Sequence, residues 1–127
     1  MQYSQKVMEH FQSPHNQGVI KDADGIGETG NIRCGDIMKL YIKVGKNDNG
    51  VEFIKDIKFE TLGCAAAIAS TSVLTDLAKG KTFDEALKID QNDIVAELGE
   101  VPAIKLHCSV LAHEALAEAI KNYQNNK

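Results

Sequence analysis

The sequence has no tryptophan, only two prolines and only three cysteines, and it lacks any long hydrophobic run. Three cysteines are too few for a small secreted domain built on disulfides, and an odd number leaves at least one thiol unpaired within the chain. Residues 1–11 contain no apolar segment of the kind found in secretory signals, and no stretch is long enough to span a membrane. We therefore expect a cytoplasmic protein with reduced thiols, in which metal binding or catalysis is favoured over disulfide bonds.

A cluster of basic residues is also missing. Lys and Arg number 14 against 18 Asp and Glu, which gives a net charge of −4. Binding to the phosphates of nucleic acid requires clustered positive charge, so we expect neither nucleic acid nor a membrane as a partner. The 127 residues, 43% of them hydrophobic, are instead typical of one globular domain, which we expect to span residues 1–127.

Hydrophobic periodicity predicts an α+β domain. Residues 38–44 and 51–61 alternate between apolar and polar side chains on either side of a polar turn, which predicts an antiparallel hairpin. Helical spacing of apolar residues, together with capping and stop signals, predicts helices over residues 4–11, 65–79, 83–87, 91–98 and 109–123.

The stretch upstream of the hairpin is rich in glycine. Gly25, Gly27 and Gly30 form a literal G-x-G-x-x-G, the pattern of dinucleotide-binding turns. That pattern binds a pyrophosphate only after an apolar strand and before a helix, whereas here polar residues precede it and a strand follows. We therefore reject a dinucleotide site and interpret residues 18–30 as a mobile loop, with a weakly signalled third strand nearby as the alternative.

The three cysteines all lie at predicted element boundaries. Cys34 precedes the first predicted strand, Cys64 lies between a strand and a helix, and Cys108 comes just before the last helix. A thiol at a loop or a helix start can meet thiols from elsewhere in the chain, whereas a thiol within an apolar stripe usually packs in the core. We therefore interpret these cysteines as candidate ligands rather than as small core residues.

Two further groups stand beside Cys108. His107 precedes it directly, and Lys105 is a cation that either lowers the pKa of the thiol and binds incoming sulfur or is simply a surface lysine. A helix N-terminus also favours the thiolate form. With His107, the cysteines form a set that suits either a tetrahedral zinc ion or a small iron–sulfur cluster.

Asp36 helps to choose between these metals. It lies two residues after Cys34, so in an extended chain both side chains point to the same side. A carboxylate is a harder ligand that holds iron more weakly than a thiolate does. Three thiolates with Asp36 or His107 as the fourth ligand would form a site that can release its cluster, and a solvated strand-start residue is the alternative for Asp36.

The remaining polar groups are interpreted as parts of the surface. A lone histidine is seldom a ligand, and no base near the hydroxyl run in the sequence marks it as nucleophilic. The residues interpreted in this way are His10, His15 and His113, and the run Ser70, Thr71 and Ser72 on the predicted helix.

Beyond these patterns, the chain resembles a known family, the IscU/NifU-type iron–sulfur cluster assembly scaffolds. Residues 34–40, 63–70 and 105–109 resemble the three ligand motifs of that family, in order and with similar spacing, and residues 3–7 and 14–16 resemble its N-terminal helix and exit. The resemblance implies an α+β fold with a small antiparallel three-stranded sheet packed by about five helices. It also implies a set of site residues: Cys34, Cys64 and Cys108 as cluster ligands, Asp36 and His107 as exchangeable ligands, and Lys105 nearby.

The resemblance further implies a scaffold rather than a turnover enzyme. A cysteine desulfurase of the IscS/NifS type would deliver persulfide sulfur to Cys108, iron would bind at the same site, and an electron donor such as ferredoxin would reduce the persulfide. The product would be a [2Fe–2S] cluster that passes to apo iron–sulfur proteins. The sequence leaves open a [4Fe–4S] cluster shared by a homodimer, and zinc in the protein as isolated.

Two features bear on the branch of the family. Residues 101–105 read Val-Pro-Ala-Ile-Lys where the family usually has Leu-Pro-Pro-Val-Lys, which weakens the expectation of a DnaK-type chaperone as a partner. The related SufU proteins carry an insertion between the second and third cysteines and lack the histidine, so a compact chain with His107 is more similar to IscU. The alternative function is a zinc-dependent SufU-like sulfurtransferase that accepts sulfur from a desulfurase.

Overall fold

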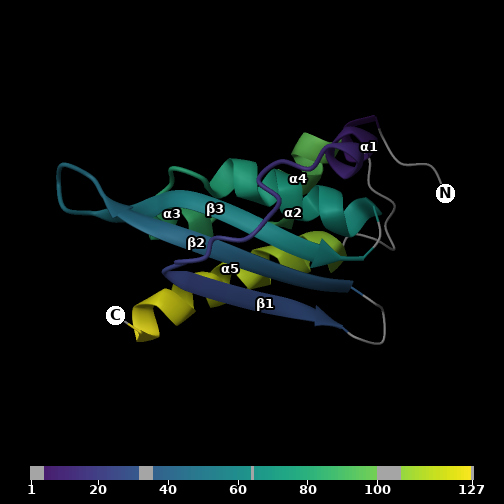
Figure 1. Ribbon diagram of the computed structural model, residues 1–127. Coiled ribbons are helices and arrows are strands. Elements are labelled where there is room, and N and C mark those ends of the chain that lie inside the picture. The colour runs from purple at the N-terminus through teal and green to yellow at the C-terminus, as the bar shows by residue number, and fades with distance from the viewer. Residues whose placement is uncertain (1–4, 32–35, 64, 100–106, 127) are drawn as a thin grey trace.

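The computed structural model describes residues 5–31, 36–63, 65–99 and 107–126, and within them it shows a three-stranded sheet and five helices (Figure 1). The strands are β1 (Gly25–Asn31), β2 (Asp36–Lys46) and β3 (Glu52–Leu62). The helices are α1 (Gln5–Gln12), α2 (Ala65–Ala78), α3 (Phe83–Leu87), α4 (Gln91–Leu98) and α5 (His107–Asn125). The predicted α+β class, the three-stranded antiparallel sheet and the five helices are confirmed.

The sheet is antiparallel throughout, in the order β1-β2-β3. The predicted hairpin corresponds to β2 and β3, which pair from Ile37 opposite Leu62 to Lys46 opposite Glu52. Asn47 explains the turn between them, because its side-chain oxygen accepts hydrogen bonds from the backbone N–H groups of Asn49 and Val51 at 2.9 and 3.0 Å.

The interpretation of residues 18–30 as a mobile loop is wrong for its second half, which forms β1. Two glycines that lower the strand propensity of this segment are needed for packing against α5. A Cβ atom on Gly27 would lie 2.1 Å from the carbonyl oxygen of Ala115, and one on Gly25 would lie 2.3 Å from that of Ala119. These glycines therefore allow the backbone of α5 to lie directly on β1.

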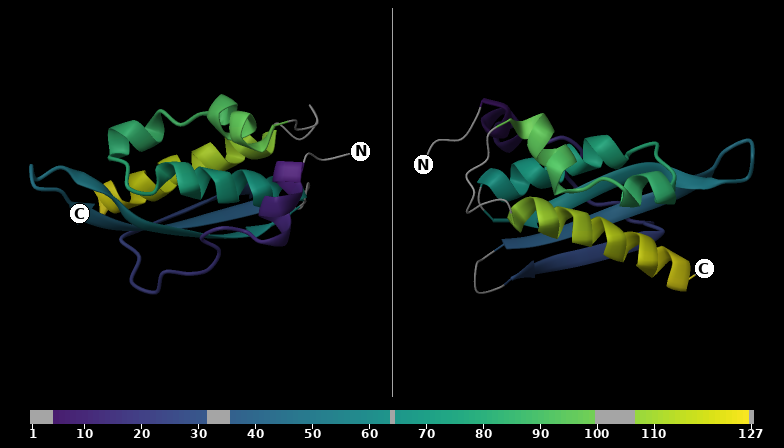
Figure 2. Two further views of the ribbon diagram at one scale, coloured as in Figure 1. Left: turned by 90° about the horizontal axis from the view of Figure 1, so that it is seen from above. Right: turned by 180° about the vertical axis from the view of Figure 1, so that it is seen from behind.

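Helices α2 to α5 cover one face of the sheet, α1 lies beside α2 at the margin of this layer, and the chain between α1 and β1 passes over the other face (Figure 2). α2 lies at the centre of the helical layer, and ten of its 14 residues are buried, including the run Ser70, Thr71 and Ser72. The prediction that this run lies on the surface is therefore wrong. The hydroxyls are compatible with burial because they find partners: Thr71 Oγ1, for example, donates to the carbonyl oxygen of Ala67 at 2.8 Å.

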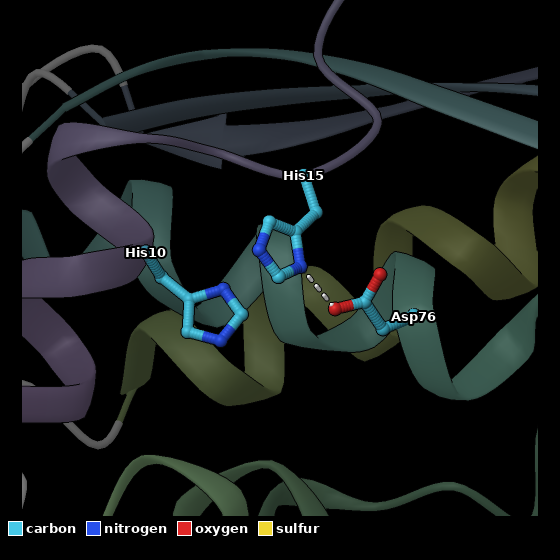
Figure 3. A group of neighbouring side chains, drawn as sticks. All are labelled: His10, His15 and Asp76. Carbon is cyan, nitrogen blue, oxygen red and sulfur yellow. Dashed lines mark hydrogen bonds and ion pairs between the residues drawn. The ribbon is translucent and has the colours of Figure 1, made fainter.

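α1 docks against α2 through polar contacts as well as through the buried side chain of Val7. The Ser72 hydroxyl lies 2.8 Å from Nδ1 of His10 and accepts a hydrogen bond of 2.9 Å from the backbone N–H of His15. Figure 3 shows His10 and His15 approaching α2 from the end of α1 and from the turn after it, with Asp76 of α2 facing His15. The end of α1 is thus fixed to the central helix at several points.

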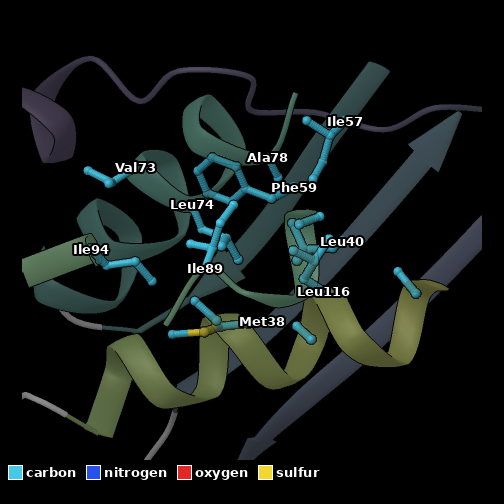
Figure 4. Close-up of a cluster of buried hydrophobic side chains, with 14 of the residues drawn as sticks. Met38, Leu40, Ile57, Phe59, Val73, Leu74, Ala78, Ile89, Ile94 and Leu116 are labelled. Carbon is cyan, nitrogen blue, oxygen red and sulfur yellow. The ribbon is translucent and has the colours of Figure 1, made fainter. Parts of the chain in front are cut away.

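The described residues form one hydrophobic core between the sheet and the helices (Figure 4). The core face of β2 and β3 packs against α2 and α5, and α4 closes the cluster. Its largest fully buried side chains are Phe59, Met38, Leu40, Ile42, Ile54, Ile57, Leu74, Ile94, Leu98, Leu116, Ile120 and Val7. The predicted apolar stripe of the last helix is confirmed, since Ala115, Leu116, Ala119 and Ile120 are all buried.

Both outer strands of the sheet have hydrogen-bond partners along their edges. On β3, Phe59 accepts from the N–H of Gly18 and donates to the carbonyl of Asn16, at 2.9 and 3.0 Å. Farther along β3, Ile54 bonds in the same way to Gly80 and Lys81. On β1, the N–H of Ile26 donates to the side-chain oxygen of Asn122 at 3.0 Å.

None of the helices formed by the described residues combines the length and the apolar composition that a bilayer crossing requires.

Candidate functional site

Several chain segments that are distant in sequence begin or end at one end of the sheet. β1 ends at Asn31 opposite Asp36, the first residue of β2, and the next residue of β2, Ile37, pairs with Leu62 at the end of β3. α2 begins at Ala65, directly after β3. Figures 1 and 2 place these strand ends and the start of α2 at the same end of the molecule.

α5 brings its first turns to this same end because it runs antiparallel to β1. Thr29, near the end of β1, donates a hydrogen bond of 2.8 Å from its hydroxyl to the carbonyl of Leu111. Gly27 faces the backbone of Ala115 and Ala119, which lie farther along the helix. The N-terminal turns of α5 therefore lie over the end of β1, close to the start of β2 and the end of β3.

The described residues include the backbone of some of the predicted site residues. Asp36 is the first residue of β2, and His107 and Cys108 are the first two residues of α5, while the side chains of all three lie outside the described part of the structure. Cys34, Cys64 and Lys105 lie outside the described residues altogether. The elements that flank the three cysteines in sequence nevertheless all meet at the end of the sheet described above.

The electrostatics of this end favour negative charge on any group placed there. α2 and α5 both begin at this end, and the N-terminus of a helix carries a partial positive charge and unpaired backbone N–H groups. A thiol near such a terminus ionises more easily than a free cysteine. The arrangement of the two helices is therefore suited to thiolates and to anions bound by them.

The outer face of the sheet beside this end is partly open. A depression of about 300 Å³ is lined by Glu28, Thr29, Gly30 and Ile37, and a second of about 270 Å³ extends from Ile37 to Leu62 on β3. Leu62, the last residue of β3, is 68% exposed. The end of the sheet is thus accessible from its outer side.

A charged row crosses the outer face next to these depressions. The register places Glu28 of β1, Lys39 of β2 and Glu60 of β3 side by side. Glu60 accepts a hydrogen bond of 2.6 Å from the hydroxyl of Tyr41, and this bond together with burial raises the pKa of Tyr41. The ammonium of Lys39 lies 5.4 Å from the centre of the Tyr41 ring, two residues farther along the same strand, which is close enough for a cation–π contact.

Two of the three other histidines, which we interpret from the sequence as surface residues, are only partly exposed. His10 is half-buried, and burial, followed by the nearby charge of His15, lowers its pKa. His113 is also half-buried, with its Nδ1 atom out of contact with solvent. His15 is exposed, but its Nδ1 lies 2.5 Å from an oxygen of Asp76.

Sequence reasoning missed the group that His10 and His15 form with Asp76. The signal available in the sequence was weak, because Asp76 is 61 residues from His15 and lies on a helix that is hydrophobic nearly all round. Only the docking of α1 against α2 brings the three side chains together.

Comparison with known proteins identifies the relatives of the chain. Residues 2–127 match the family model described as "NifU-like N terminal domain". The chain is 55% identical over 121 residues to "Iron-sulfur cluster assembly scaffold protein IscU 1" of Archaeoglobus fulgidus, which covers 95% of this chain and 76% of that protein. It is 46% identical over 130 residues to the "Iron-sulfur cluster assembly scaffold protein IscU" of Escherichia coli K12. That match covers 100% of this chain and 98% of the E. coli protein.

A solved structure extends the comparison to the fold. The N-terminal part of a nitrogen-fixing NifU-like protein from Brucella abortus superimposes with a TM-score of 0.73 at 20% sequence identity. The superposition covers 97% of this chain and 94% of that one. At this level of identity, the similarity shows that the two chains share a fold.

Proposed function

Because the chain belongs to the NifU-like N-terminal domain family, we propose that it is a scaffold on which an iron–sulfur cluster is assembled and from which the cluster is transferred. The relatives at 55% and 46% identity are both named as iron–sulfur cluster assembly scaffold proteins. The observation that carries the proposal is the convergence of β1, β2, β3, α2 and α5 at one end of the sheet. Each of the three cysteines in the sequence is flanked by elements that meet there.

The two helix N-termini at this end explain why the site would hold an anionic cargo. Thiolates and bridging sulfides carry negative charge, which the partial positive charges of α2 and α5 stabilise. The cluster in this proposal is the cargo of the protein. Cys34, Cys64 and Cys108 would bind its iron as thiolates.

Cys108 is our candidate for the sulfur acceptor because it is the second residue of α5. Its thiolate would attack the terminal sulfur of a cysteine persulfide on a desulfurase, and the desulfurase thiolate would leave. Two electrons from a donor such as ferredoxin would then cleave the new S–S bond, which yields sulfide and restores the Cys108 thiolate. Lys105, three residues earlier in the sequence, would stabilise the negative charge during this exchange.

Release of the cluster would depend on the fourth ligand. Asp36 is the first residue of β2 and His107 the first residue of α5, and both elements begin at the end of the sheet where the flanking elements of the cysteines meet (the convergent end). Oxygen and nitrogen ligands hold iron less tightly than thiolates do, so either residue would provide an exchangeable bond. In this proposal the protein carries the cluster to apo iron–sulfur proteins and does not turn over a substrate as an enzyme would.

Anaerobic reconstitution tests the proposal. The purified chain is incubated with ferrous iron, cysteine, a cysteine desulfurase and a reductant, and its iron and acid-labile sulfide are measured with its absorption and Mössbauer spectra. We expect two iron and two sulfide per chain for a [2Fe–2S] cluster. A [4Fe–4S] cluster shared by two chains gives the same ratio per chain, so a dimer and the Mössbauer and absorption spectra of the four-iron cluster would distinguish it.

Serine substitutions of the three cysteines test which residues bind the cluster, and a substitution at the neighbouring Ser109 is the matched control. Cys34→Ser, Cys64→Ser and Cys108→Ser should each reduce the cluster content, whereas Ser109→Ala, next to Cys108, should leave it unchanged. A chain that retains one zinc ion, forms no cluster and still accepts persulfide sulfur would contradict the scaffold proposal and favour a zinc-dependent sulfurtransferase. Zinc in the protein as first purified would not decide the question, because thiolates bind it readily.

A further inference from the structure

His10, His15 and Asp76 form a compact group of metal-ligating side chains on the described part of the chain. One potential ligand atom from each residue lies within 4.8 Å of the other two. The centres of the two imidazole rings are 4.6 Å apart, and Figure 3 shows the ring of His15 between that of His10 and the carboxylate of Asp76. From these contacts we infer that His10, His15 and Asp76 form a second metal site, which binds a divalent transition-metal ion such as Zn²⁺.

The chemistry of the ligand set favours this class of ion. Two imidazole nitrogens and one carboxylate oxygen suit Zn²⁺ and its neighbours in the first transition series, and they leave at least one position for water. Mg²⁺ and Ca²⁺ prefer sets made of oxygen atoms. The group contains no thiolate, so it differs in kind from the cysteine set at the convergent end of the sheet.

Neighbouring side chains hold the ligands in place. The Ser72 hydroxyl lies 2.8 Å from Nδ1 of His10 and accepts a hydrogen bond from the backbone N–H of His15, so one group orients both histidines. The side-chain amide of Asn16 donates hydrogen bonds of 3.0 Å to Oδ1 of Asp76 and to Thr75. Such partners of metal ligands commonly raise affinity because they reduce the freedom that binding must remove.

The backbone supports the same geometry. Ser72 and Asp76 are four residues apart on α2, which places them on one face of the helix. Asn16 adopts a left-handed conformation with φ of 60°. The backbone turns at this residue, directly after His15, and the side chain of Asn16 reaches Asp76. The site therefore depends on the docking of the end of α1 against α2.

An ion can reach the group without unfolding of the chain. The side chains of His15 and Asp76 are 54% and 42% exposed. Their ring nitrogen and carboxylate oxygen are now 2.5 Å apart, whereas two ligands of a tetrahedral Zn²⁺ lie about 3.3 Å apart for bonds of about 2.0–2.1 Å. Both side chains are exposed enough to open by this amount, and the ion would replace the hydrogen bond between them.

The alternative is a hydrogen-bonded contact that binds no metal. In that case the cluster would only fix α1 to α2. The two interpretations differ in whether the group binds an ion with a defined stoichiometry.

Cobalt titration of a full-length chain without thiols distinguishes them. Cys34, Cys64 and Cys108 are replaced by serine so that the cysteine set cannot compete, and Co²⁺ binding is followed by visible absorption and calorimetry. We expect one equivalent of Co²⁺, with ligand-field bands but no thiolate-to-cobalt charge-transfer band, and displacement by Zn²⁺. In the same background, His15→Gln or Asp76→Asn should weaken binding by about tenfold or more.

Two controls make the result specific. His113→Gln removes a histidine outside the cluster and should leave the affinity unchanged. In the chain with its three cysteines intact, His15→Gln should lower the total number of bound Co²⁺ ions by one, which tests the site even if the thiol-free chain folds poorly. The inference is refuted if the thiol-free chain folds but binds no Co²⁺ stoichiometrically, or if His15→Gln and Asp76→Asn bind as well as their parent.

Discussion

Substitution of Gly27 by alanine tests how closely α5 lies against β1. The added methyl carbon would lie 2.1 Å from the carbonyl oxygen of Ala115 and 2.4 Å from the backbone nitrogen of Ala119. Ordinary contacts of carbon begin near 3.5 Å, so the helix would have to move by roughly 1 Å. Overpacking of this kind costs about 1–3 kcal/mol, and we expect the upper part of that range because backbone atoms cannot rotate away.

A smaller effect of opposite sign comes from the unfolded chain. Alanine has less backbone freedom than glycine there, which stabilises the folded state by about 0.4–1 kcal/mol. The net loss is therefore about 2 kcal/mol, or a fall of roughly 8 °C in Tm for a domain of this size. Urea denaturation of the metal-free chain should show a lower midpoint with an unchanged slope.

A neighbouring variant separates steric conflict from general sensitivity of β1. Glu28 is adjacent to Gly27 but exposed on the outer face, so Glu28→Ala should change stability by less than about 0.5 kcal/mol. Because the conflict at Gly27 is with the backbone of Ala115, the second substitution Ala115→Gly should not restore stability. The packing argument fails if Gly27→Ala is as stable as Glu28→Ala, or if Ala115→Gly rescues it.

Three further predictions concern the site and the helix ends. Asp36→Ala should slow transfer of a reconstituted cluster to an apo-acceptor, measured by stopped-flow absorption, and unchanged rates would exclude Asp36 as the exchangeable ligand. Burial lowers the pKa of His10 below 6.5, so the unfolded chain takes up a proton before the folded one does as the pH falls. The stability contributed by His10 is thus present above pH 6.5 and lost below it, and His10→Gln should flatten the dependence of the unfolding free energy on pH in that window; an unaltered dependence would contradict this. Thr82→Ala removes the capping box with Glu85 and should cost about 1 kcal/mol in thermal unfolding, whereas a loss near zero would show that α3 is held by packing alone.

The features that could be predicted from sequence are those with a local periodic signal. The β2–β3 hairpin and the apolar stripe of α5 both follow from the spacing of apolar residues along one segment. The capping boxes at Thr82 and Asp90 follow from side chains three residues apart. In each case the residues that determine the element lie within that element or directly before it.

The features that could not be predicted depend on contacts between segments. β1 reads as a loop because the reason for its glycines, the backbone of α5, lies about 90 residues later in the chain. The hydroxyls of α2 read as surface residues because nothing near them in sequence shows that the helix is covered on several sides. The cysteine ligands and Lys105 remain predictions from sequence and family, whereas the convergence of the flanking elements is a property of the fold.

The covered edges of the sheet have a consequence for the time the protein spends without a cluster. A strand with unpaired backbone groups is a template for aggregation with a second chain. Here the edge of β3 is occupied by the backbone of Asn16 and Gly18 at one end and of Gly80 and Lys81 at the other. None of these contacts involves a cysteine, so we expect them to protect the edge of β3 from aggregation in the protein without a cluster as well.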